Sequence, residues 1–175
     1  NLVNEFSDFA RMPKPILKKT NLLSIIKENL NLLNEIDKTV KINFVSNENE
    51  YWMICDSEQI SRVFFNLVKN SIESVQEKAS KTPNLSKKID IVIENKNDYI
   101  NLIITDNGIG FVEENLSNIL KPYYTTKEKG TGLGLSIVNK ILNDHNSTIN
   151  FIKQKIGAKI VINFSKNGNW NTYYW

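Results

Sequence analysis

Hydrophobic residues recur at two spacings along this chain, and the spacing predicts which segments form helices and which form strands. Apolar residues three or four positions apart are typical of amphipathic helices, and alternation of apolar and polar residues is typical of strands. The predicted helices are residues 1–12, 20–35, 56–79 and 133–143. The predicted strands are residues 40–45, 51–55, 89–93, 100–104, 148–153 and 159–164.

Capping and breaking residues indicate where the predicted helices begin and end. Pro13 and Pro15 end the first helix, because proline lacks the backbone N–H that a helix interior needs. Thr20 is the expected N-cap of the second helix, and Asp56, with Gln59 three positions later, is the expected cap of the third. The predicted divisions are a helical stub at 1–12, a linker at 13–19, a main body at 20–164 and a tail at 165–175.

The order of these elements predicts the fold class. Strands arrive in pairs and helices arrive singly along the chain. This order favours one mixed, mostly antiparallel sheet with helices packed on one face, which is a two-layer α+β sandwich.

Composition narrows the classes of function. With 41% hydrophobic and 23% charged residues, the chain is typical of a soluble globular protein and not of a disordered one. Its net charge of +3 is scattered, which is too mild to indicate nucleic-acid binding. The single Cys55 excludes an internal disulfide, and the single His145 excludes a metal site built on a pair of histidines. No apolar run reaches the ~18 residues that a membrane span needs.

Three polar residues share one stripe of the third predicted helix. Asn66 and Asn70 are four positions apart and Glu73 follows three positions later, so all three lie on one side of the helix, beside its apolar face. An amide oxygen is a suitable ligand for a hard cation such as Mg²⁺. The alternative is a solvated helix edge, because asparagine is frequent throughout this chain.

A glycine-containing segment follows the strand at 100–104. The sequence Asp106-Asn107-Gly108-Ile109-Gly110 places a carboxylate at the strand end and two glycines after it, which allow the backbone to approach a flat ligand closely. A carboxylate there could accept a hydrogen bond from an exocyclic amine such as that of adenine. The alternative is a plain turn at the exit of the strand.

A second glycine cluster precedes the last predicted helix. Residues Gly130 to Leu135 would direct backbone N–H groups at an anion, aided by the helix dipole, although the spacing is that of neither a P-loop nor a dinucleotide fingerprint. Between the two clusters, Lys121 to Lys127 carries lysines and hydroxyls that could close over phosphates. The alternatives are a flexible hinge for the glycines and an ordinary surface loop for the lysine segment.

In this order and spacing, the four elements resemble the N, G1, F and G2 boxes of the Bergerat-fold (GHKL) ATP-binding superfamily. That superfamily contains gyrase-type topoisomerases, mismatch-repair clamps, a class of heat-shock chaperones and sensor histidine kinases. The segment Asn66–Asn70 looks like the N box of histidine kinases, and Gly130–Leu135 looks like their G2 box. The stub from Glu5 to Pro13 resembles the end of the second dimerisation helix in nitrogen-regulation sensors of the NtrY type.

The resemblance implies a role for each matching residue. Asn70 would ligate an Mg²⁺ ion that bridges the ATP phosphates, and Asn66 would help to position phosphate and metal. Asp106 would bind the adenine amine, and Lys127 would contact phosphates from a mobile lid over residues 116–131. The other residues that the resemblance places around the nucleotide are Lys69, Glu73, Gly108, Ile109, Gly110, Tyr124, Thr125, Thr126, Gly130, Thr131, Gly132, Leu133, Gly134 and Leu135.

Three positions qualify this reading. The ATP-hydrolysing members of the superfamily carry a water-activating Glu where this chain has Asn66, and an amide cannot act as a general base, so transfer to another acceptor is favoured over hydrolysis. His145 matches a structural turn after the last helix, so we expect it to be structural and not the phosphate acceptor. Ala158 stands where many members carry a threonine near the adenine.

The resulting expectation is an ATP-binding catalytic domain of a sensor histidine kinase, with the acceptor histidine on a dimerisation domain outside this chain. The implied cofactors are ATP and Mg²⁺, and the implied partners are the protein's own dimerisation domain and a response regulator. The intact protein would be a homodimer, while a monomeric fragment is compatible with the sequence. It would be cytoplasmic and attached to an inner membrane through other segments. The alternatives are an ATP-hydrolysing clamp and a non-enzymatic module that senses nucleotide.

Overall fold

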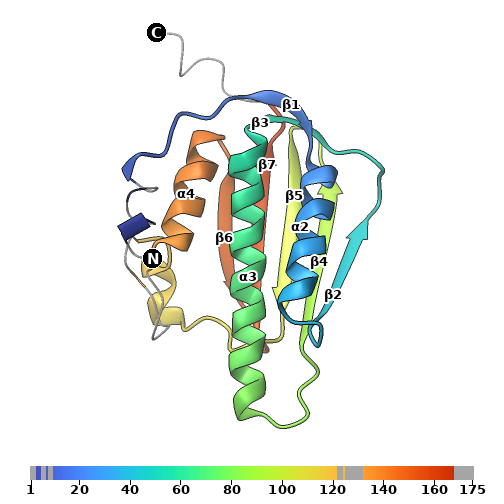
Figure 1. Ribbon diagram of the computed structural model, residues 1–175, viewed down its shortest axis with the longest axis vertical. Coiled ribbons are helices and arrows are strands. Elements are labelled where there is room, and N and C mark those ends of the chain that lie inside the picture. Colours follow the sequence, from blue (N-terminus) through green and yellow to red (C-terminus); the bar gives the residue numbers. More distant parts are fainter. Residues whose placement is uncertain (1–2, 5–6, 8–9, 122–123, 125–131, 168–175) are drawn as a thin grey trace.

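A five-stranded sheet with helices on one face forms the body of the molecule (Figure 1). The computed structural model describes residues 3–4, 7, 10–121, 124 and 132–167. The helices are α2 (Leu22–Ile36), α3 (Ser57–Lys81) and α4 (Gly134–Asp144). The strands of this sheet are β2 (Lys41–Ser46), β4 (Lys88–Asn95), β5 (Tyr99–Asp106), β6 (Thr148–Lys153) and β7 (Ala158–Ser165). The layered α+β fold predicted from the sequence is confirmed.

The strand order across the sheet is β2-β4-β5-β7-β6. β2 pairs with β4 in parallel, and every other neighbouring pair in the sheet is antiparallel. Alternate residues of the central strands, such as Ile91 and Leu102, are fully buried under the helices. The opposite face of these strands is only half-buried, so the core lies between the sheet and its single helical layer.

A second, two-stranded sheet joins β1 (Lys18–Asn21) to β3 (Trp52–Cys55) in antiparallel pairing. β3 was predicted as a strand at 51–55, but the prediction of a single sheet missed β1 and its pairing with β3. β1 begins inside the stretch predicted to be a linker. The segment Lys-Lys-Thr-Asn has no alternation of apolar and polar residues, so only its pairing with β3 makes it a strand. A short 3₁₀ helix at Glu113–Asn118 was also missed.

The caps of two helices differ in detail from the prediction. Asn21, not Thr20, is the N-cap of α2, and its Oδ1 accepts the N–H of Leu23 at 3.1 Å. Thr20 belongs to β1 instead. Asp56 caps α3 as expected, because its Oδ1 accepts the N–H groups of Glu58 and Gln59, each at 3.1 Å.

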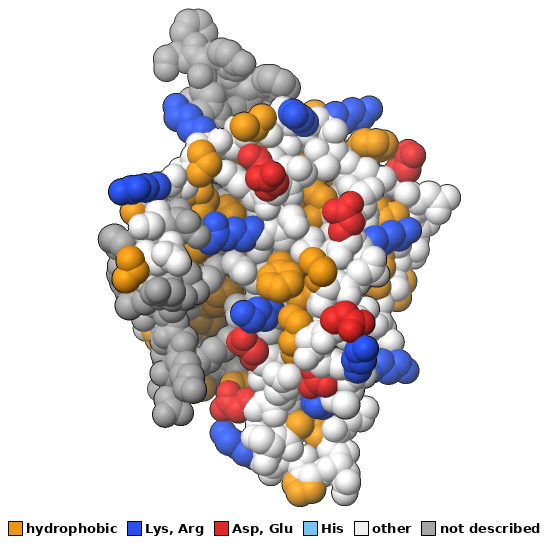
Figure 2. Space-filling model, viewed as in Figure 1, with side chains coloured by type: hydrophobic (Ala, Val, Ile, Leu, Met, Phe, Trp, Pro, Cys, Tyr) orange, Lys and Arg blue, Asp and Glu red, His pale blue; other side chains and the backbone are white. Residues whose placement is uncertain are grey.

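The surface of the helical layer carries acidic and basic side chains side by side (Figure 2). Neither sign forms a large continuous field on this face, as the small net charge of the sequence also suggests. Among the described residues, no helix has the length and apolar character needed to cross a membrane.

Candidate nucleotide site

One side of α3 brings the predicted site elements together. Asn66, Asn70 and Ser74 are spaced four residues apart, so they follow one another along a single edge of the helix. At the end of this edge, the Oγ of Ser74 accepts the backbone N–H of Ile109 at 3.0 Å, which shows that the edge faces the glycine loop. The other side of α3 faces α2, where Ser61 accepts a hydrogen bond from Asn29 at 2.8 Å.

Helix α4 packs against α3 and runs in the opposite direction (Figure 1). The backbone N–H of Asp56, at the start of α3, donates to Nε2 of His145, directly after α4, at 3.1 Å. Because both helices rise about 1.5 Å per residue, the first turn of α4 lies level with the part of α3 that contains Asn66 and Asn70. The start of α4 and the asparagine stripe are therefore neighbours, as a shared phosphate and metal site requires.

The glycine loop Asp106–Gly110 packs directly on α3. A Cβ atom on the buried Gly108 would lie 2.1 Å from the Oγ of Ser74 and 2.6 Å from its backbone carbon. Only glycine fits such an approach without displacing the helix. The backbone N–H of Gly108 also donates to Oδ1 of Asp106 at 2.9 Å, so the same close contact orients the carboxylate.

The turn between β6 and β7 supports the loop from the other side. A Cβ on Gly157 would lie 1.7 Å from the carbonyl oxygen of Asp106, and one on Gly110 would lie 2.7 Å from the carbonyl oxygen of Gly157. Both glycines have a positive φ, at 75° for Gly110 and 72° for Gly157. The loop is thus fixed between α3 and this turn by backbone contacts on each side.

The Asp106 carboxylate is almost completely buried, with 6% of the residue exposed. This burial raises the pKa of Asp106, because the charged form loses its water. Hydrogen bonds from Gly108, the Ser71 hydroxyl and the backbone of Ala158, together with the positive charge of Lys78, act against that increase in pKa. A buried carboxylate in this environment is well suited to accept a hydrogen bond from a neutral amine.

The N-terminus of α4 presents backbone groups with no side-chain cap among the described residues. Leu133 occupies the N-cap position, and its side chain is fully buried. Gly132 has a positive φ of 72°, and a Cβ on Gly134 would meet nothing described within 4 Å. Backbone N–H groups without a side-chain cap are what an anion such as a phosphate requires. Leu135 follows in the first turn and is half-buried.

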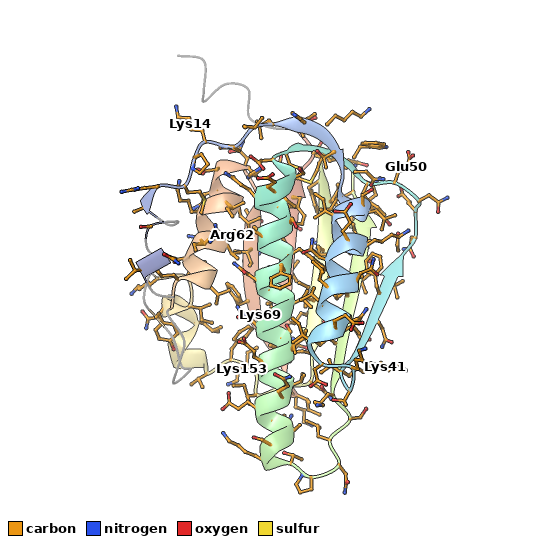
Figure 3. All side chains as sticks on the ribbon, in the orientation of Figure 1. Lys14, Lys41, Glu50, Arg62, Lys69 and Lys153 are labelled. Carbon is orange, nitrogen blue, oxygen red and sulfur yellow. The ribbon has the colours of Figure 1, made fainter. Side chains whose placement is uncertain are left out.

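The remaining predicted residues lie on α3, on the glycine loop or after it, or outside the described residues. Lys69 is exposed on the outer face of α3 (Figure 3), about 100° around the helix from Asn70. Glu73 is half-buried on α3 and Ile109 is 48% exposed on the loop. Tyr124 is half-buried, and its backbone N–H donates to the carbonyl of Lys121 at 3.3 Å. The predicted residues outside the described part of the chain are Thr125, Thr126, Lys127, Gly130 and Thr131.

His145 occupies a structural position, as expected. It is 2% exposed, and its Nδ1 lies 2.7 Å from the carbonyl oxygen of Ile141. Since Nε2 accepts the N–H of Asp56, the proton of the neutral ring is on Nδ1 and is donated to Ile141. Both ring nitrogens are therefore engaged within the fold.

Two contributions of α3 were not predicted from the sequence. Ser71 is next to the Asp106 carboxylate, and Ser74 binds the glycine loop. The regular spacing of Asn66, Asn70 and Ser74 was a usable signal for Ser74, but the contact of Ser71 depends on how α3 lies on the sheet.

A cavity of about 600 Å³ lies at the other end of the sheet, away from the site described above. It is lined by Glu48, Asn49, Glu50, Trp52, Asn95 and Lys166. Asn95 is the last residue of β4, whereas Ile89, which pairs with Asp106, is near the other end of the same strand. The cavity therefore contains none of the residues predicted to bind nucleotide.

A known protein family matches the part of the chain that carries this site. The family described as "Histidine kinase-, DNA gyrase B-, and HSP90-like ATPase" matches residues 55–168, which include α3, the glycine loop and α4. The chain belongs to this ATPase family. Membership implies an ATP-binding domain, in agreement with the geometry at α3.

The chain also resembles individual proteins, several of which are named as sensor histidine kinases. The chain is 35% identical over 165 residues to an NtrY-like sensor histidine kinase named in Rickettsia conorii, covering 94% of this chain and 26% of that protein. It is 31% identical over 160 residues to the nitrogen regulation protein NtrY of Azorhizobium caulinodans, covering 85% of this chain and 19% of that protein. The chain thus spans about a quarter or less of the length of these relatives.

Solved structures of this ATPase family share the fold. The catalytic domain of the histidine kinase ThkA superposes with a TM-score of 0.76 at 27% identity, covering 86% of this chain and 96% of that domain. ThkA in complex with the response regulator protein TrrA gives a TM-score of 0.78 at 24% identity, covering 94% of this chain and 46% of ThkA. At that lower identity, the likeness to ThkA in the complex supports the fold alone.

Proposed function

We propose that this ATPase-family domain is the catalytic domain of a sensor histidine kinase, and that it presents the γ-phosphate of Mg-ATP to a histidine on a dimerisation domain outside this chain. The observation that carries the proposal is the convergence on α3 of the asparagine stripe, the Asp106 loop and the first turn of α4. The main body at 20–164 would bind the nucleotide. Residues 1–12 would continue a dimerisation helix, 13–19 would link the two, and 165–175 would form a tail.

In this proposal, Asp106 binds the adenine. Its buried carboxylate would accept the hydrogen bond from the exocyclic amine, while Gly108 and Gly110 let the loop that carries it pack closely on α3 and on the β6–β7 turn. Burial strengthens such a hydrogen bond because no water competes for the acceptor.

In this proposal, the phosphates are bound by the asparagines of α3 and by the first turn of α4. Asn70 would supply an amide oxygen to Mg²⁺, which neutralises charge on the phosphates when bound, and Asn66 would orient a phosphate oxygen. The uncapped N–H groups of Gly134 and Leu135 would bind phosphate oxygens. Lys127 in the predicted lid would add a positive charge, a role that stays a prediction from the motif.

The reaction that this arrangement supports is transfer and not hydrolysis. A histidine nitrogen of the acceptor domain would attack the γ-phosphorus, the bond to the β-phosphate oxygen would break, and ADP would leave. Asn66 has no basicity with which to activate water, which favours an acceptor from another domain. By the same proposal, the intact protein is a homodimer that is attached to an inner membrane and passes its phosphate to a response regulator.

Isothermal titration of ATP, with and without Mg²⁺, tests the proposal. We expect binding in both conditions and tighter binding with Mg²⁺. In Asn70→Ala, binding without Mg²⁺ should persist while the increment from Mg²⁺ is lost. The control is Asn34→Ala, which removes an exposed asparagine from α2, away from the site. Absence of ATP binding by the folded chain, with Mg²⁺ present, would contradict the proposal.

A further inference from the structure

Ser74 makes two contacts with the glycine loop. Its Oγ accepts the N–H of Ile109 at 3.0 Å, and the same Oγ lies 2.1 Å from the position that a Cβ on Gly108 would take. A serine satisfies both requirements, because it is small enough for this approach and its hydroxyl oxygen accepts a hydrogen bond. Alanine would keep the space and lose the acceptor.

The position of Ser74 along α3 gives these contacts a consequence for the site. Ser74 is one helical turn after Asn70, and the Gly108 that packs on it donates its N–H to Asp106. Two contacts therefore connect α3 to the predicted adenine acceptor: the hydroxyl of Ser71 binds the Asp106 carboxylate directly, and Ser74 holds the loop that carries it. A shift of the loop along α3 would change the distance between the two ends of the bound nucleotide.

We propose that Ser74 is a positioning residue for nucleotide recognition, which fixes the adenine-binding loop on α3 at the correct distance from Asn70. This inference rests on the proposed function of the site. Ser74 itself does not contact the base in the proposal, and it acts through Ile109 and Gly108 on the carboxylate of Asp106. Its contribution should therefore appear in how well the site distinguishes one base from another.

The test compares ATP with inosine triphosphate, which has a carbonyl oxygen where adenine has its amine and so cannot donate to Asp106. Removing one hydrogen bond that orients the loop should weaken ATP binding about fivefold. In Ser74→Ala, we expect that loss for ATP and little change for inosine triphosphate, so that the ratio of the two dissociation constants falls by the same factor. Calorimetry with Mg²⁺ measures both constants.

A matched control lies on the same helix. Ser61→Ala also removes a hydroxyl that makes a hydrogen bond from α3, but on the side that faces α2. It should leave the preference for ATP over inosine triphosphate unchanged, even if both variants lose thermal stability. Ser74→Cys keeps the shape of the side chain with a slightly larger sulfur atom and weakens the acceptor, so its preference should resemble that of Ser74→Ala. This variant also decides the question if Ser74→Ala does not fold.

The outcomes separate this inference from the function on which it rests. Equal losses for ATP and inosine triphosphate, or unchanged binding of both, in a folded Ser74 variant would overturn the positioning role. If the wild-type chain binds ATP while a Ser74 variant gives one of these results, the proposed function is still supported. A wild-type chain that binds neither nucleotide would refute both.

Discussion

At the scale of single residues, Asp106 carries the sharpest prediction about binding. Asp106→Asn should weaken ATP binding by about 1.5–3 kcal/mol, the range for a hydrogen bond to a charged group. The amide keeps an oxygen for the N–H of Gly108, so the loop can stay in place. The buried site would, however, hold a neutral group in place of the charged acceptor, and an amide nitrogen could face the adenine amine. Calorimetry on both forms measures the difference, and equal affinities would contradict the assignment.

His145 makes the stability of the fold depend on pH. Burial lowers the pKa of His145 below its usual 6.5, because the charged ring would lose water and would direct a second N–H at the N–H of Asp56. The charges of Asp56 and Asp144 oppose this lowering of the pKa. The unfolded chain therefore binds a proton more readily than the folded one. The contribution of the neutral His145 ring to the free energy of unfolding is therefore complete above pH 6.5. It is lost as the pH falls toward the pKa of His145 in the folded protein.

Urea denaturation between pH 7.5 and 5.5 should show this loss. We expect the free energy of unfolding to be lower at pH 5.5 than at pH 7.5. His145→Gln removes the titrating group while keeping one acceptor and one donor, so the decrease should largely disappear. An identical pH dependence in both proteins would contradict the role given to His145.

At the scale of elements, Asp56 connects three parts of the chain. Its side chain caps α3 through Oδ1, and its Oδ2 accepts the N–H of Ile16 at 2.9 Å. Its own N–H is bound by His145 after α4. Gln59, three positions after Asp56, was expected to take part in this cap, but the N–H of Asp56 is already bound by His145. The Nε2 of Gln59 donates instead to the carbonyl of Pro13 at 3.0 Å.

Asp56→Ala should lower the free energy of unfolding by about 1–2 kcal/mol, the usual cost of losing an N-cap. Asp56→Asn should cost less, because an amide oxygen can still cap α3 while the bond to Ile16 is lost. Urea denaturation ranks the variants. Hydrogen exchange should show a faster Ile16 amide in Asp56→Asn with the amides of α3 still protected. Equal stability of all three proteins would show that the cap is dispensable.

At the scale of the whole molecule, the fold separates the only histidine from the predicted phosphate site. His145 follows the 11 residues of α4, which span about 16 Å, and the phosphates would bind at the other end of that helix. Phosphoryl transfer needs the nucleophile near ~3 Å from phosphorus and in line with the leaving oxygen. A buried side chain with both nitrogens engaged cannot reach that position.

The chain should therefore bind Mg-ATP without labelling itself from radioactive ATP. A dimerisation domain that carries its own histidine, supplied separately, should become labelled. Asn70→Ala, which removes the predicted metal ligand, should no longer label the supplied dimerisation domain. Stoichiometric, acid-labile label on this chain that disappears in His145→Gln would refute the structural role of His145 and the need for a separate acceptor.

The sequence by itself determined most of the elements and the family resemblance. The main-sheet strands and the three described helices follow from local spacing of apolar residues, which reports the face that each element buries. The residues of the site are also local in origin, because Asn66 with Asn70 and Asp106 with Gly108 are close neighbours in sequence. Their types alone indicate metal, base and phosphate binding, and the family match is to the same segments.

Only the tertiary structure decided how these parts meet. Strand order, the parallel pairing of β2 with β4 and the existence of β1 depend on contacts between distant segments, which no local spacing encodes. The same holds for Ser74, which contacts Ile109 across 35 positions, and for His145, which bonds to Asp56 across 89. Local pattern shows which side of an element is buried. The neighbour that buries it is chosen by packing of the whole chain, and these contacts set the geometry of the site.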